Sequence, residues 1–115
     1  MLVVEDEALI ALDIAENLKK VGAKVIIARV LEDALAKAEL PNLAAAVIDH
    51  ALDGRSTSDV CAKLKDRNIP FIVYTGFNKL EGACASGELV HKPATPQLLV
   101  ATLQGAITNR HRGIN

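Results

Sequence analysis

Short apolar runs alternate with longer helical stretches along the chain, and this alternation limits the folds that 115 residues can adopt. Each run is apolar on both faces, which is typical of strands in a parallel sheet that helices cover on both sides. The runs span residues 2–4, 25–28, 45–48, 71–74 and 89–90. The alternation predicts a single α/β domain over residues 1–115, with a five-stranded parallel sheet and right-handed crossovers.

Between the runs, apolar residues recur at helical spacing. The first helical stretch places Ile10, Ile14 and Leu18 on one face, as an amphipathic helix does. The stretch over residues 78–86 is weaker, because it offers few side chains to bury and contains Gly82. We therefore expect a short or mobile fourth helix there.

The last helical stretch has a clear start and an open end. Thr95 is expected to cap it, with Pro96 at the first helical position. The final residues, "NRHRGIN", are mildly basic and are expected to form a frayed tail.

Composition and charge exclude several classes of function. The formal net charge of −1 and the scarcity of aromatic residues give no reason to expect nucleic-acid binding. No apolar run approaches the roughly 20 residues of a membrane span, and no secretion signal is evident. Cys61 and Cys84 match no metal-ligand spacing. We therefore expect a cytoplasmic protein with two buried or idle thiols and no membrane partner.

Polar residues follow four of the five apolar runs, at the point where each predicted strand ends. Glu5 and Asp6 follow the first run, Asp49 the third, Thr75 the fourth and Lys92 the fifth. Because function in such sheets lies outside the carboxyl ends of the strands, these side chains are expected to meet at one edge.

The chemistry of this set is coherent. Several carboxylates close together repel one another, and Mg²⁺ with its preference for oxygen ligands relieves the repulsion. Asp49 can act as a nucleophile toward a phosphoryl group, while a metal ion and Lys92 supply positive charge. Taken singly, each residue also suits an ordinary role, such as helix capping for Asp6 or Glu7 and a turn for Asp49. All these ordinary roles would have to coincide at one sheet edge, and a shared functional site explains the whole set better.

The motifs "VVEDE", "VIDHALDG", "YTG" and "HKP", in this order and spacing, resemble the receiver domain of bacterial two-component response regulators. The resemblance covers nearly all of the chain. It implies a flavodoxin-like, three-layer (βα)5 receiver fold with a sheet of order 2-1-3-4-5. It also implies that Asp49 is phosphorylated by a sensor histidine kinase or a phosphotransfer protein.

The resemblance further implies a Mg²⁺ site at the acidic residues. Asp6 and Asp49 would be direct ligands, and Glu5 would act through a water molecule. The backbone carbonyl of Ala51 would be a third protein ligand.

On the phosphoryl side, the resemblance implies that Thr75 is the switch hydroxyl and Lys92 the phosphate-binding cation. The peptide bond between Lys92 and Pro93 is commonly cis in this family, and proline permits this at modest cost.

Two departures from the usual family pattern concern the readout. Leu89 stands where the family usually has an aromatic switch residue. Phe77 after Thr75-Gly76 resembles a subgroup with a Thr-Gly-aromatic motif, and this resemblance implies that the signal passes through ordering of the segment that follows. In this family, the side chains two residues after the acceptor and two residues after the Thr flank the water that hydrolyses the phosphorylated Asp. Here they are Ala51 and Phe77, which cannot orient a water molecule, so self-dephosphorylation is expected to be slow.

We expect a stand-alone or excised receiver with no enzymatic activity beyond its own phosphoryl transfer and slow dephosphorylation. Its downstream protein partner would bind the face of the fourth helix, the fifth strand and the last helix. The main alternative is a pseudo-receiver, a binding module that works without phosphorylation. Two further alternatives are less consistent with the sequence. A small phosphatase with an aspartyl intermediate typically has a second Asp where this chain has Ala51, and a flavin carrier needs a phosphate-binding loop where this chain has acidic residues.

Overall fold

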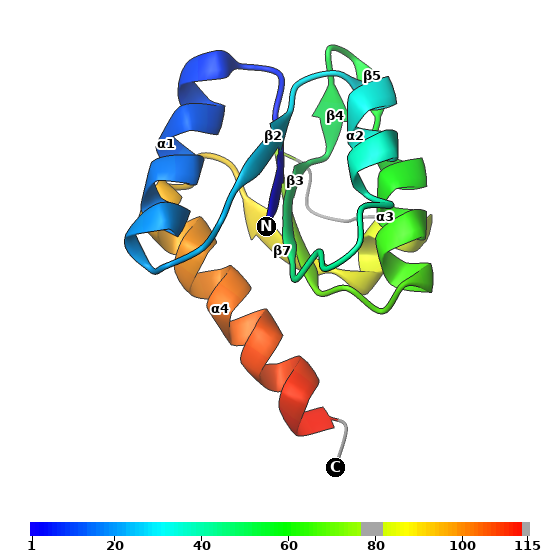
Figure 1. Ribbon diagram of the computed structural model, residues 1–115. Helices are drawn as coiled ribbons and strands as arrows, with labels where there is room; N and C mark the ends of the chain where they lie inside the picture. Colours follow the sequence, from blue (N-terminus) through cyan, green and yellow to red (C-terminus); the bar gives the residue numbers. More distant parts are fainter. Residues whose placement is uncertain (77–81, 114–115) are drawn as a thin grey trace.

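The computed structural model describes residues 1–76 and 82–113, with side chains up to residue 109. A five-stranded parallel sheet forms its middle layer (Figure 1). The strands lie in the order β2 (Ile26–Ala28), β1 (Leu2–Val4), β3 (Ala46–Asp49), β6 (Phe71–Thr75) and β7 (Glu88–His91). Numbered along the chain within this sheet, the order is 2-1-3-4-5, which confirms the predicted topology.

Helices cover both faces of the sheet and complete three layers. One face carries α1 (Ala8–Lys20) and α4 (Pro96–Gly113), and the other carries α2 (Leu31–Lys37), α3 (Ser58–Asp66) and the short 3₁₀ helix η1 (Gly82–Ser86). Figure 1 shows these two groups on opposite sides of the strands. Within the described part of the chain, no helix is both long enough and apolar enough to cross a membrane.

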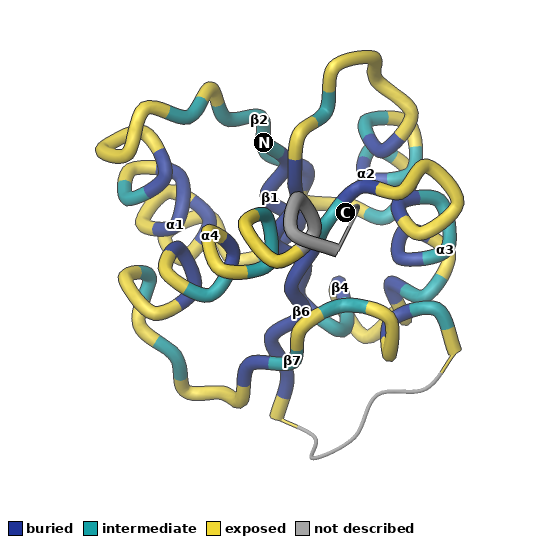
Figure 2. Tube along the Cα trace, turned by 90° about the horizontal axis from the view of Figure 1, so that it is seen from below, coloured by how far each residue is buried: buried dark blue, intermediate teal, exposed yellow. Residues whose placement is uncertain are grey.

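The sheet is buried on both faces because successive side chains of each strand point to opposite layers. Leu2 and Val4 pack into the cluster under α2 and α3, whereas Val3 packs into the cluster under α1 and α4. Figure 2 shows the central strands as buried segments and the outer sides of the helices as exposed. This double burial explains why the strands appear in the sequence as continuous apolar runs.

The predicted start of the last helix is confirmed. The backbone N–H of Leu98 donates to the Thr95 hydroxyl at 3.1 Å, and α4 begins at Pro96. The helix continues to Gly113, and fraying of the tail stays a prediction.

The expected weak fourth helix is a single short 3₁₀ helix, η1, over Gly82–Ser86. The remainder of that predicted stretch falls in residues 77–81, outside the described residues. A small antiparallel hairpin, β4 (Ala51–Leu52) with β5 (Arg55–Ser56), follows β3 and was not expected from the sequence.

The expectation of two idle thiols is wrong. Cys61 on α3 and Cys84 on η1 form a disulfide, with their Cα atoms 5.0 Å apart. Both residues are buried, and they lie 23 positions apart in the sequence. Ligand-spacing rules could not reveal the pair, because only the packing of η1 against α3 on one face of the sheet brings the two sulfur atoms together.

Candidate functional site

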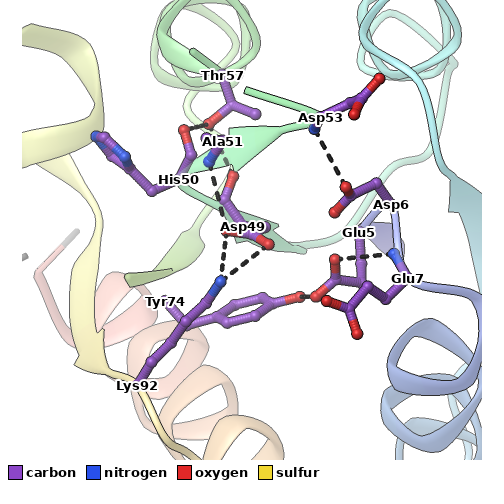
Figure 3. A network of polar contacts seen from close by, with 10 residues as sticks. All are labelled: Glu5, Asp6, Glu7, Asp49, His50, Ala51, Asp53, Thr57, Tyr74 and Lys92. Carbon is purple, nitrogen blue, oxygen red and sulfur yellow. Dashed lines mark hydrogen bonds and ion pairs between the residues drawn. The ribbon is translucent and has the colours of Figure 1, made fainter. Parts of the chain in front are cut away.

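Three carboxylates meet at the carboxyl edge of the sheet. Glu5 directly follows β1, Asp6 stands in the turn before α1, and Asp49 is the last residue of β3. One oxygen atom from each lies within 4.8 Å of the others. Glu5 and Asp49 are only 1% and 5% exposed, whereas Asp6 is half-buried. The structure thus brings the predicted acidic residues together, as Figure 3 shows.

Hydrogen bonds hold both oxygen atoms of Glu5. The Tyr74 hydroxyl donates to Oε1 at 2.5 Å, and the backbone N–H of Glu7 donates to Oε2 at 3.1 Å (Figure 3). Burial raises the pKa of Glu5 to about 7, with contributions from the neighbouring carboxylates of Asp6 and Asp49. The two donors oppose this rise. Near neutral pH, Glu5 is therefore close to the midpoint of its titration.

Asp6 is anchored through both its backbone and its side chain. The Asp53 backbone N–H donates to Oδ2 at 3.2 Å. The Arg29 guanidinium, at the end of β2, donates to the Asp6 carbonyl at 3.1 and 3.3 Å. The hydrogen bond with Glu5 lowers the pKa of Asp6, so this carboxylate is charged where its neighbour holds the proton.

The helix-capping role considered for Glu7 is not found. Glu7 occupies the N-cap position of α1, but its side chain makes no capping hydrogen bond with the described residues. Capping therefore does not account for the run of three acidic residues.

Asp49 faces a lysine that follows the fifth strand of the sheet. The Lys92 ammonium lies 3.0 and 3.1 Å from the two carboxylate oxygens of Asp49. Lys92 directly follows β7, and the Lys92–Pro93 peptide bond is cis, as expected. Thr75 ends β6, is buried, and accepts the Lys92 backbone N–H at its carbonyl at 2.8 Å.

Ala51 lies two residues after Asp49, in β4. Its backbone N–H donates to Oδ1 of Asp49 at 3.4 Å. The role of its carbonyl as a metal ligand stays a prediction. The proposed contribution of Phe77 to a slow dephosphorylation lies outside the described residues.

Two residues that the sequence did not single out shape this site. The buried Thr57 hydroxyl lies 2.8 Å from the carbonyl oxygens of both Asp49 and His50, and it ties the loop after β3 to the start of α3. Tyr74 was placed in an apolar strand and in the "YTG" motif, but it was given no role of its own. The available signal was its hydroxyl, because a buried tyrosine usually finds a hydrogen-bond partner. Burial, followed by the contact with Glu5, raises the pKa of this hydroxyl.

A cavity of about 570 Å³ borders the site. Glu5, Tyr74 and Lys92 belong to its lining, and α1 and α4 contribute apolar residues such as Ile14 and Leu99. The cavity therefore shares one carboxylate, Glu5, with the acidic cluster, and it also reaches Tyr74 and Lys92 beside that cluster.

Known structures resemble this chain over nearly its full length. A CheY-like receiver domain protein from Methanospirillum hungatei JF-1 is 24% identical, with a TM-score of 0.82, over 97% of this chain and 95% of that one. The response regulator PhyR from Brucella abortus is 31% identical, with a TM-score of 0.80, over 98% of this chain and 49% of that one. The chain thus spans about half the length of PhyR.

A response regulator from Burkholderia pseudomallei, solved with a phosphorylated aspartic acid and a calcium ion, is 24% identical, with a TM-score of 0.76. The likeness covers 98% of this chain and 71% of that one. No family model and no curated protein matches the sequence. From the sheet order and these structural likenesses, the chain has the receiver-domain fold of response regulators.

Proposed function

We propose that this chain is a phosphoacceptor receiver, in which Asp49 takes a phosphoryl group from a phosphohistidine of a sensor kinase or phosphotransfer protein. The observation that carries the proposal is the position of the Asp49 carboxylate between the acidic pair Glu5–Asp6 and the Lys92 ammonium. A nucleophilic carboxylate beside a cation and a candidate metal site suits phosphoryl transfer, which depends mainly on positioning and charge neutralisation.

The donor set fits Mg²⁺. One oxygen atom from each of three carboxylates lies within 4.8 Å of the others, and only Lys92 forms an ion pair with Asp49 among the described residues. Asp6, Asp49 and the Ala51 carbonyl would hold the ion directly, and Glu5 would act through a metal-bound water. The indirect role suits Glu5 because both of its oxygens already accept hydrogen bonds. Mg²⁺ supplies charge neutralisation at the phosphoryl oxygens.

The chain's own residues divide the reaction among them. An Asp49 carboxylate oxygen attacks phosphorus, the bond from phosphorus to the histidine nitrogen breaks, and the imidazole leaves with its electron pair. Lys92 turns from Asp49 to a phosphoryl oxygen and stabilises its charge. Thr75, buried at the end of the neighbouring strand, donates its hydroxyl to another phosphoryl oxygen.

The output is a change in a protein-binding surface. The surface proposed for the downstream partner is formed by η1, β7 and α4, the elements that follow Thr75 along the chain. A pseudo-receiver that binds its partner without phosphorylation is the second candidate, and the presence of the complete acidic set favours the phosphorylated form.

The test is phosphorylation with acetyl phosphate and Mg²⁺, read by intact-protein mass. The wild type is expected to gain one phosphoryl group, and Asp49→Asn none. Asp53→Asn is the matched control, because Asp53 lies nearby in the turn between β4 and β5, contacts Asp6 only through its backbone N–H and has a positive φ of 49° that Asn tolerates. Equal labelling of Asp49→Asn and the wild type would refute the acceptor, and no labelling of the wild type would favour the pseudo-receiver.

A further inference from the structure

We propose that Tyr74 is a positioning residue of this site, which orients Glu5 through its hydroxyl and supports Lys92 through its ring. The inference rests on the proposed function, because it concerns the residues expected to bind Mg²⁺ and the phosphoryl group. Tyr74 stands in the "YTG" motif, but neither the motif nor the resemblance to receivers gave this tyrosine a role of its own.

The sheet places Tyr74 next to the acceptor. In the register of β3 and β6, Tyr74 pairs with Asp49, and the His50 N–H donates to the Tyr74 carbonyl at 3.2 Å. The Tyr74 side chain is 4% exposed and packs in the core layer under α1 and α4. From there it passes the end of β3 and reaches Glu5 at the end of β1, as Figure 3 shows.

The hydroxyl fixes one of the two oxygens of Glu5. It donates to Oε1 at 2.5 Å, while the Glu7 backbone N–H donates to Oε2 at 3.1 Å. With both oxygens held, the carboxylate keeps a single orientation, and the remaining lone pairs are available to a metal-bound water. Partners that orient a metal-binding group in this way commonly change metal affinity when they are removed.

The ring acts on the other side of Asp49. The Lys92 ammonium lies 5.1 Å from the centroid of the Tyr74 ring, within the range of a cation–π interaction. The same ammonium contacts both Asp49 oxygens, although the Lys92 side chain is 42% exposed. A long side chain with this exposure can adopt several conformations. The contact with the Tyr74 ring favours those that keep the ammonium beside Asp49. One aromatic residue therefore contacts both groups that flank the acceptor.

Two substitutions separate the hydroxyl from the ring. Tyr74→Phe removes the hydrogen bond to Glu5 and keeps the ring under Lys92, whereas Tyr74→Leu removes both. A purely structural role would lower the stability of each variant without changing Mg²⁺ affinity or the phosphorylation rate at saturating Mg²⁺. Val73→Ala is the matched control, because Val73 is fully buried on the same strand but packs in the opposite layer.

Mg²⁺ binding can be followed in the wild type through Tyr74 itself. It is the only tyrosine of the chain, which has no tryptophan, so the tyrosine fluorescence comes from this one side chain. Binding near Glu5 is expected to change that fluorescence at the Mg²⁺ concentration at which calorimetry detects binding.

By calorimetry, Tyr74→Phe is expected to bind Mg²⁺ about tenfold more weakly than the wild type. At saturating Mg²⁺, acetyl phosphate should label Tyr74→Phe at the wild-type rate and Tyr74→Leu several-fold more slowly. Val73→Ala should keep the wild-type Mg²⁺ affinity despite its lower stability.

Each part of the inference has its own contrary outcome. Wild-type Mg²⁺ affinity in Tyr74→Phe would overturn the role of the hydroxyl. Equal labelling rates for the Phe and Leu variants at saturating Mg²⁺ would overturn the role of the ring. Both results leave the proposed function intact, whereas a wild type that binds no Mg²⁺ by calorimetry overturns the proposed Mg²⁺ site together with this inference.

Discussion

At the scale of single residues, Glu5 shows how the fold changes the properties of a side chain. Its pKa rises from 4.5 to about 7, chiefly because it is buried. Between these two pH values, the folded chain holds a proton that the unfolded chain has released. The free energy of unfolding therefore falls as the pH rises through this window, and the destabilisation is complete above pH 7.

Glu5→Gln is expected to stabilise the metal-free protein, since the amide never ionises. The gain should be about 1–3 kcal/mol at pH 8 and clearly smaller at pH 5, where the folded wild type already carries the proton. Urea unfolding in the presence of EDTA measures the difference. Glu16→Gln, an exposed change on α1, should have little effect at either pH. A gain for Glu5→Gln that is the same at both pH values would contradict the titration of Glu5.

At the scale of elements, Gly87 allows η1 to end close to β6. A Cβ atom at this position would lie 2.5 Å from a ring carbon of Phe71 and 2.9 Å from the Phe71 carbonyl oxygen. Real Cβ contacts essentially never come this close, and one of the two neighbours is backbone. The absence of a side chain at Gly87 is therefore a packing requirement between the two segments.

We expect Gly87→Ala to lower the free energy of unfolding by about 1–3 kcal/mol through overpacking. Gly105→Ala on α4 is the matched control, because a Cβ there meets no atom within 4 Å. It should raise stability by up to about 1 kcal/mol, since alanine favours a helix interior. The urea midpoints of the two variants are compared with that of the wild type. A Gly87→Ala protein as stable as the wild type would refute the close packing.

The disulfide between α3 and η1 also belongs to this scale. It closes a loop between residues 23 positions apart, which restricts the unfolded chain and stabilises the fold by about 3 kcal/mol. A reductant should lower the urea midpoint of the wild type by a corresponding amount. The double variant Cys61→Ala/Cys84→Ala should not respond to the reductant. An unchanged wild-type midpoint, with both thiols shown to be free, would count against the stabilisation.

At the scale of the whole molecule, the sequence was enough to predict the three layers and the gathering of polar residues at the carboxyl edge of the sheet. Strands that are apolar on both faces require helices on both sides, and parallel strands bring residues such as Asp49 and Lys92 to one edge. The strand order came from the resemblance to receivers rather than from the alternation of elements.

What the sequence did not reveal are contacts between side chains far apart in the chain. Tyr74 and Glu5 are separated by 69 positions, and their hydrogen bond depends on the tilt of one side chain across a neighbouring strand. The Cys61–Cys84 disulfide depends in the same way on how η1 packs on α3. No local sequence pattern predicts such long-range contacts, because they depend on how the elements pack in three dimensions.

Mg²⁺ should stabilise the molecule as a whole, since the unfolded chain has no preformed site. At about 100 times the dissociation constant, the ion is expected to add about 2.7 kcal/mol to the free energy of unfolding. Urea unfolding with Mg²⁺ and with EDTA measures the gain. Asp6→Asn should lose most of it, and an equal gain in Asp6→Asn and the wild type would argue against ion binding at this edge.

The cavity beside the carboxylates has a consequence for how the molecule can be controlled. Glu5 lines it, and so do Tyr74 and Lys92, which contact Glu5 and Asp49, so a compound in the cavity would touch residues of the acidic site. Thermodynamic reciprocity then applies: any compound that bound in the cavity and altered Mg²⁺ affinity would itself bind more or less tightly, by the same factor, when the ion is present. Screening for cavity ligands with and without Mg²⁺ would therefore sort compounds by the sign of their coupling to the site.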